Sequence, residues 1–325
     1  MMVLLAAVVV LFGAWGGLAL AYCTALAGRV RAVSLTAWLL VWAAALAGLA
    51  TGWHAGLALF GVAAIVLLAW WMSLRPSNER AWIPEVARQT HGEVEGDRVT
   101  LYNVRNFTWR SPSDFDERWE TRTYELSRMR SLDLALSYWG RPAIAHAMLS
   151  FGFDDGRYIV FSVEIRRKQG DQFSEIGGFF RNYELSVIAA DEEDCLRVRT
   201  NVRGEDGHLF RIHMPREAMR SLFLAYVETA NDLVRRPRFY NTLTANCTTL
   251  VFQMAQRIVP GLPLDYRLIF SGYLPEYLFE LGALRGADDV TAYRSAGRYT
   301  DRARRTAEGE SFSRNIRLGV PGVEP

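Results

Sequence analysis

Charge is almost missing from the first quarter of this 325-residue chain. Residues 1–28 carry none, and Arg29 and Arg31 are the only charged residues before residue 75. The uncharged run that follows them, 32–74, is too long for one membrane span and matches two helices of about 20 residues each. A signal peptide is the alternative for the first apolar segment, but that segment lacks a basic region ahead of it. We expect three transmembrane helices, near residues 2–24, 33–51 and 55–73.

Net charge is also missing from the rest of the chain. The sequence has 37 basic and 35 acidic residues, and without Arg29 and Arg31 there are 35 of each sign. A balanced surface lacks the excess of positive charge with which proteins bind nucleic acid. Three cysteines, one of them in a predicted span, do not make a disulfide framework. The chain has no Gly-rich phosphate loop or dinucleotide-binding fingerprint, and His208 and His213 fall on opposite faces of one predicted strand. We therefore expect no nucleic-acid partner, no cofactor and no metal.

Beyond the spans, the pattern indicates one mixed domain. Residues 75–97 are polar and contain two prolines, as expected of a linker. Amphipathic helical patterns follow Pro215 and precede Pro260. We expect an α+β domain over 98–284, an antiparallel sheet with packed helices, and a flexible tail over 285–325, which is charged and aperiodic. Strand-like segments separated by turn signals cover 98–109, 143–153, 157–167, 183–190, 195–202 and 207–214.

A lone cysteine stands where the second helical pattern begins. In "ANCTTLVFQMAQRI", residues 245–258, Asn246 is a good N-cap residue, and helical spacing places Cys247 on the buried face. Helix N-termini favour a thiolate, and their backbone N–H groups, such as that of Thr248, could hold an oxyanion. The alternative is a small buried cysteine of purely structural value.

A thiolate nucleophile needs a base, and His146 is the best candidate. It opens an otherwise apolar strand, where an unpaired imidazole is costly, although it could equally be a satisfied core histidine. A three-residue turn at 154–156 would place His146 opposite Glu164, whereas a turn one residue shorter or longer would put them on opposite faces. The alternative for Glu164 is a structural ion pair with Arg166 or Arg199.

Several of these motifs carry a family resemblance. The segments "AHAMLSFGF", "FSVEIRRKQGDQFSEIGGFFRNYEL", "ADEEDCLRVRTN" and "FYNTLTANCTTL" resemble the Lnb-type N-terminal periplasmic domain family, formerly a domain of unknown function. The similarity covers about residues 80–258. Characterised members are bacterial lipoprotein N-acyltransferases, in which a thiol takes an acyl chain from phospholipid. The order of histidine, polar residue and Asn-Cys helix start also looks like a permuted papain-like or NlpC-like thiol fold.

The resemblance implies roles for individual residues. Cys247 corresponds to the nucleophile and His146 to the base, with Glu164 as the candidate third residue. The partners implied are a phospholipid acyl donor, a lipoprotein or other amine acceptor, and the bilayer. Further candidates for binding substrate or an oxyanion are Asn246, Thr248, Tyr240, Asn241 and Arg166.

Topology is the point on which two lines of reasoning disagree. With three spans, Arg29, Arg31, Arg75 and Arg80 share one side, which the positive-inside rule assigns to the cytoplasm. The family resemblance implies a periplasmic domain on a multi-pass protein of the bacterial inner membrane, and we follow the family. Two other functions stay open: an NlpC-like cell-wall peptide hydrolase with the same dyad, and a non-enzymatic membrane-tethered interaction module.

Overall fold

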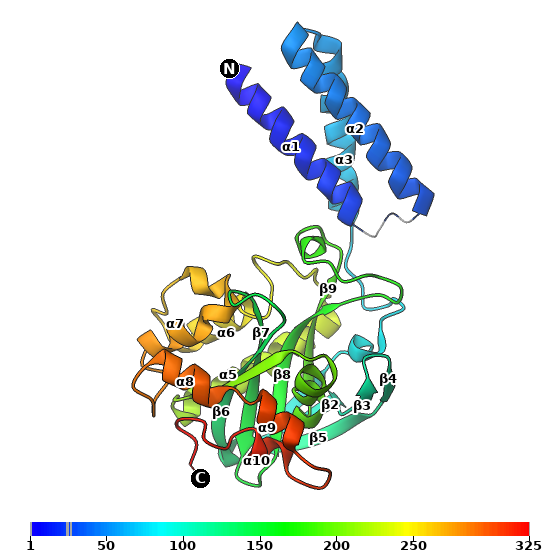
Figure 1. The fold of residues 1–325 in the computed structure, drawn as a ribbon. Coiled ribbons are helices and arrows are strands. Elements are labelled where there is room, and N and C mark those ends of the chain that lie inside the picture. The colour runs from blue at the N-terminus through cyan, green and yellow to red at the C-terminus, as the bar shows by residue number, and fades with distance from the viewer. Residues whose placement is uncertain (1, 24–25, 27, 325) are drawn as a thin grey trace. The chain divides into compact units, whose positions relative to one another are not determined.

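A computed structural model describes residues 2–23, 26 and 28–324, which form two compact units (Figure 1). The first unit comprises Met1–Arg80, Arg167–Glu184 and Arg238–Thr242. The second comprises Ala81–Arg166, Leu185–Pro237 and Leu243–Pro325. Two segments of the first unit, Arg167–Glu184 and Arg238–Thr242, therefore come from the middle of the chain.

The first unit contains three apolar helices, as predicted. They are α1 (Met2–Tyr22), α2 (Gly28–Thr51) and α3 (His54–Ser73), and each is long and apolar enough to cross a membrane. Glycine lets α1 and α2 approach closely: the Trp38 indole N–H donates to the Gly13 carbonyl at 2.9 Å, and a Cβ atom on Gly16 would lie 2.4 Å from the Trp38 ring. Small residues at such contacts are typical of packed transmembrane helices.

The second unit is built on an eight-stranded sheet in the order β1-β2-β9-β8-β7-β6-β10, with β5 paired to β2 and a separate β3–β4 hairpin. Most of the pairs are antiparallel, but β2 and β9 run in parallel, so the sheet is not a simple meander. The strands are β1 (His91–Glu95), β2 (Arg98–Arg105), β3 (Thr108–Ser111), β4 (Asp114–Asp116), β5 (Trp119–Glu125), β6 (Met129–Tyr138), β7 (Ala145–Phe153), β8 (Tyr158–Arg166), β9 (Glu184–Ala190) and β10 (Asp206–Ile212).

The β7–β8 hairpin has the predicted register. Met148 pairs with Ser162, and the turn closes through Gly156, whose φ of 80° is the left-handed conformation that glycine adopts freely. The same register, continued by two residues, places His146 opposite Glu164. The local chemistry of a three-residue turn therefore positions two polar side chains of the candidate site.

Helix α5 (Arg216–Arg235) covers one face of this hairpin. The Phe161 and Tyr226 rings stack with their centroids 4.8 Å apart, and the Phe151 and Phe223 rings meet edge-on at 5.2 Å. Because side chains alternate along a strand, the odd-numbered residues of β7 and β8 face α5. The even-numbered ones, His146 among them, lie on the opposite face.

One predicted strand is helical instead. Residues 195–202 belong to α4 (Glu192–Cys195) and the π-helical turn η4 (Val198–Val202). Asp191 starts α4, since its carboxylate accepts the Glu193 N–H at 2.9 Å, and this cap outweighs the strand-like alternation. The other helices of the chain up to residue 284 are α6 (Thr249–Ile258), α7 (Leu274–Glu280), η1 (Pro84–Val86), η2 (Leu126–Arg128), η3 (Ile176–Phe179), η5 (Tyr266–Leu268) and η6 (Ser271–Tyr273).

The expectation of a flexible tail over 285–325 is wrong. This segment forms α8 (Val290–Gly297), α9 (Thr300–Arg305) and α10 (Phe312–Asn315), and Tyr293 and Tyr299 are fully buried. The segment is ordered by long-range burial, which the lack of helical periodicity does not reveal. The folded domain also starts earlier than residue 98, because β1 lies in the expected linker.

Candidate active site

Cys247 lies in the turn that opens α6. Asn246 makes this turn, because its side-chain oxygen accepts the N–H groups of Thr248 and Thr249, both at 2.8 Å. Asn246 thus supplies the predicted capping bonds, but to the turn ahead of α6, whose N-cap position is Thr248. However, α6 begins only at Thr249, so Cys247 does not continue its apolar stripe and is partly exposed instead of lying on the buried face. Cys247 as a whole residue is therefore half-buried.

His146, from β7, joins Cys247 to a pair of groups on β8. Its Nε2 lies 2.7 Å from Ser162 Oγ and 3.0 Å from Glu164 Oε1, while Ser162 Oγ donates its hydrogen to Glu164 at 2.6 Å. Since the one hydroxyl hydrogen of Ser162 is used in this way, its oxygen accepts from His146, and Nε2 carries the proton. This leaves Nδ1 as the ring nitrogen for the interaction with Cys247.

The charges in this group favour an ion pair. Burial by itself would lower the pKa of His146, but the Glu164 carboxylate outweighs it, and with the hydrogen bond to Cys247 it raises the pKa to about 9. Burial alone would likewise raise the pKa of the Cys247 thiol, but the hydrogen bond and charge of His146, with the Ala147 N–H, lower it. A thiolate beside an imidazolium is the reactive form of a cysteine nucleophile.

Glu164 is held in its charged form by a third partner. Arg199, on η4, donates to the same oxygen at 3.1 Å and reaches Glu205 at 3.3 Å with its other terminal nitrogen. Although burial would raise the pKa of Glu164, the charges and hydrogen bonds of His146 and Arg199 hold it well below its ordinary range. Glu164 therefore contacts both of these partners that the sequence offered as alternatives, His146 and Arg199.

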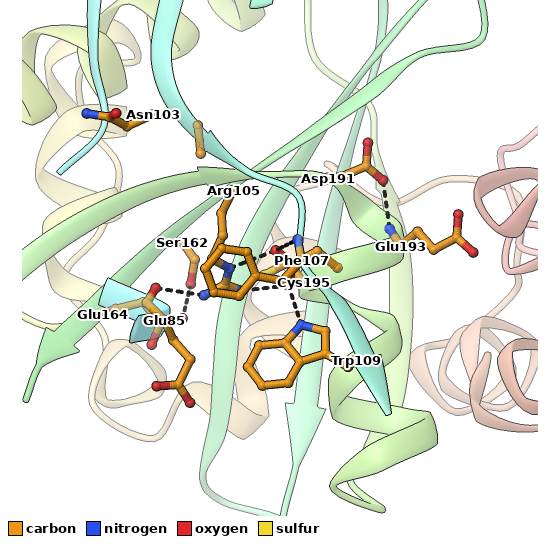
Figure 2. A network of polar contacts seen from close by, with 12 residues as sticks. Glu85, Asn103, Arg105, Phe107, Trp109, Ser162, Glu164, Asp191, Glu193 and Cys195 are labelled. Atoms are coloured by element: carbon orange, nitrogen blue, oxygen red, sulfur yellow. Dashed lines mark hydrogen bonds and ion pairs between the residues drawn. The ribbon is translucent and has the colours of Figure 1, made fainter. Parts of the chain in front are cut away.

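A buried network around Asp194 supports the helix that carries Arg199. Asp194 is fully buried and accepts from the Arg105 guanidinium at 2.8 and 3.1 Å, from the Phe107 N–H at 2.9 Å and from the Trp109 indole at 2.7 Å. Figure 2 shows Arg105, Phe107 and Trp109 converging beside Cys195, with Ser162 and Glu164 close to them. This network joins β2 and β3 to α4, which leads directly into η4.

The Thr248 N–H that was expected to hold an oxyanion is engaged elsewhere. The Thr248 N–H is already donated to Asn246, so only its hydroxyl, 3.9 Å from the Cys247 sulfur, remains near the thiol. The N–H of Cys247 itself has no hydrogen-bond partner among the residues that the structure describes. That N–H is the donor best placed to meet an oxyanion formed on a carbonyl attached to the sulfur.

Arg166 belongs to the framework. Its guanidinium donates to the backbone carbonyls of Val86 and Ala87 at 2.8 and 2.7 Å and lies 4.5 Å from the centre of the Trp82 ring. These contacts attach β8 to the segment ahead of β1, so they do not support the substrate role that was expected of Arg166.

Tyr240 and Asn241 fall in the other compact unit. Within that unit, the Tyr240 N–H donates to the Tyr183 carbonyl at 2.9 Å. Their predicted contribution to substrate binding stays a prediction.

Sequence reasoning missed Ser162, although the signal was available. Ser162 is two residues before Glu164 on a strand, so the two share a face. Arg199 was considered only as a structural partner, because residues 195–202 were interpreted as a strand.

Two cavities, of about 510 Å³ beside α5 and α6 and about 340 Å³ in the first unit, are not lined by Cys247 or His146. Within the described residues, no three His, Cys, Asp or Glu side chains gather as a metal site.

Comparisons with known proteins place this site within a family. Residues 115–272 match the family model described as the Lnb N-terminal periplasmic domain. No curated protein and no solved structure matches the chain. The matched segment includes His146, Ser162, Glu164, Arg199 and Cys247. The chain therefore carries, over residues 115–272, a domain that belongs to the Lnb N-terminal periplasmic domain family.

Proposed function

We propose that this protein is a membrane-anchored thiol acyltransferase that acts on lipid esters through a thioester on Cys247. The observation that carries the proposal is the continuous chain of contacts from the partly exposed Cys247 through His146 to Glu164. A small structural cysteine needs none of these partners. A non-enzymatic module would leave Cys247 and His146 apart, whereas their side chains are close enough for each to shift the pKa of the other.

In the first half of the proposed reaction, the thiolate attacks the carbonyl carbon of a phospholipid ester. A C–S bond forms, the carbonyl π electrons move to the oxygen, and the Cys247 N–H stabilises the oxyanion. When the oxyanion collapses, the ester C–O bond breaks, and the His146 imidazolium gives its Nδ1 proton to the leaving alcohol. The products are a lysophospholipid and an acyl thioester on Cys247.

In the second half, an amine takes the acyl group. The amine nitrogen attacks the thioester carbonyl, a C–N bond forms and the C–S bond breaks, while neutral His146 accepts the proton that the nitrogen loses. This step regenerates the thiolate and the imidazolium. Glu164 stays ionised throughout and holds His146 in place by its contact with Nε2. The N-terminal amine of a lipoprotein is the acceptor that the family suggests.

The membrane helices support a lipid substrate over a peptide one. One span suffices for a tether, whereas three helices among the described residues are long and apolar enough to cross a bilayer, and such helices would keep the domain close to a phospholipid donor. We further propose a multi-pass inner-membrane location with the domain in the periplasm, as the family description implies. We also propose a permuted papain-like fold for the domain. In such a fold, the strand that carries the histidine precedes, along the chain, the helix start that carries the cysteine.

The test compares substrates. Purified protein is incubated with phospholipid plus a synthetic diacylated lipopeptide, and separately with muropeptides. The proposal predicts a lysophospholipid and an N-acylated peptide, both lost in Cys247→Ser and retained in Cys23→Ala, which changes a buried cysteine of the first unit. Release of free fatty acid without an N-acylated peptide would mean that the protein is a hydrolase and not a transferase. Cleavage of muropeptides without lipid turnover would favour the cell-wall hydrolase and contradict the proposal.

A further inference from the structure

The loop between β8 and β9 carries exposed apolar side chains. In this loop, residues 167–183, Phe173, Ile176 and Phe179 expose 55%, 43% and 40% of their surface. Such side chains are stabilised when another surface covers them. All three lie within seven residues, so one surface could cover them together.

The same loop is fastened to the ends of two apolar helices. The buried Phe180 ring stacks on that of Tyr22, the last residue of α1, with centroids 6.3 Å apart, and meets the Trp71 ring of α3 edge-on at 6.5 Å. The Arg181 guanidinium lies 4.9 Å from the centre of the Trp71 ring and donates to the Trp71 carbonyl at 2.7 Å. Aromatic residues at the ends of spans mark the boundary between bilayer and water. The loop therefore lies at the level of that boundary.

The polar groups nearby also suit a lipid headgroup layer. A cavity of about 340 Å³ lies within the same unit and is lined by Tyr22, Arg31, Asp171 and Asn182, among others. Arg31 stands in the first turn of α2, and long basic side chains near the ends of spans extend to the membrane interface. The exposed apolar side chains match the acyl-chain layer of a bilayer surface, and the nearby basic residue matches its headgroup layer.

We propose that the loop over residues 167–183 is a membrane-contacting element, in which Phe173, Ile176 and Phe179 insert among the phospholipids at the bilayer surface. Phe180 and Arg181 hold the loop to α1 and α3. The partner is the phospholipid bilayer around the protein's own spans. This inference does not depend on the thiol chemistry, since it concerns contact with lipid and not turnover.

The experiment measures lipid contact directly. Phe173→Cys, Ile176→Cys and Phe179→Cys are each introduced into the full chain carrying Cys247→Ser, so that the added cysteine is the one exposed to label, since the remaining Cys23 and Cys195 are buried. Each is labelled with the environment-sensitive dye NBD and placed in nanodiscs of phosphatidylethanolamine and phosphatidylglycerol. We expect blue-shifted emission, quenching by lipids with a doxyl group near the headgroup, and protection from aqueous iodide. Ser113→Cys, on the exposed β3–β4 turn, is the matched control and should show the reverse.

Two outcomes would overturn the inference. If the three labels are quenched by iodide as strongly as the control, the loop faces water. If they are protected from iodide but not quenched by doxyl lipids, a protein surface covers them. A second variant tests the anchor: Phe180→Ala should reduce lipid quenching of a label at position 176, while thermal unfolding reports whether the domain stays folded.

Discussion

At the scale of single residues, the reactivity of Cys247 depends on His146. The hydrogen bond and charge of the imidazole lower the pKa of the thiol, so a larger fraction is thiolate at pH 7. We predict that His146→Ala slows iodoacetamide labelling of Cys247 and lowers turnover by about 10²–10⁴-fold, the usual contribution of an acid–base group. His208→Ala, which removes another partly buried histidine paired with a carboxylate, is the matched control and should change neither rate.

Glu164 sets the alkaline limit of the ion pair. Because the folded-state pKa of His146 is raised to about 9, the imidazolium is present below that pH and is lost as the pH rises through it. Removing the carboxylate in Glu164→Gln lowers this pKa, so the alkaline limb of the pH–rate profile should move to lower pH. Glu193→Gln, at an exposed ion pair, should leave the limb in place. An unmoved limb in Glu164→Gln would mean that another group controls it.

At the scale of elements, the cap of α6 positions the nucleophile. Asn246 is buried, and its side-chain oxygen receives two N–H groups that would otherwise lack a partner. We predict that Asn246→Ala lowers the free energy of unfolding by about 1–2 kcal/mol. It should also slow alkylation of Cys247. Asn246→Asp keeps the acceptor and should restore most of the stability, as measured by urea denaturation. Equal losses in both variants would contradict the capping role.

The elements also show where sequence reasoning succeeds. The turn at 154–156 is local, and it sufficed to predict the β7–β8 register and hence the contact of His146 with Glu164. Strand β6 was missed because it carries the buried, charged Asp133, whose partner Arg317 lies 184 residues away. Local patterns cannot reveal a polar group that is satisfied at such a distance.

At the scale of the whole molecule, the C-terminal segment completes the domain through one buried cation. Arg317 is held by Asp133 at 2.8 Å and Glu192 at 2.6 Å, and its guanidinium lies 3.5 Å from the centre of the Tyr158 ring. Arg317→Ala would leave two buried carboxylates without this partner. We predict a loss of about 3–5 kcal/mol in the free energy of unfolding. Arg314→Ala, on the exposed side of α10, should cost far less. Similar unfolding midpoints for the two variants would mean that Arg317 does not attach this segment to the domain.

The central claim is that Cys247 carries an acyl group, and mass spectrometry of the trapped intermediate tests it most directly. Protein in nanodiscs with phospholipid of a single chain length, and no acceptor, is quenched in acid and digested. The account predicts a Cys247 peptide heavier by that one acyl chain. The added mass should be removed by neutral hydroxylamine, should follow a change of the lipid's chain length, and should be strongly reduced in His146→Ala. An unmodified Cys247 peptide under conditions in which lipid is consumed would contradict the account.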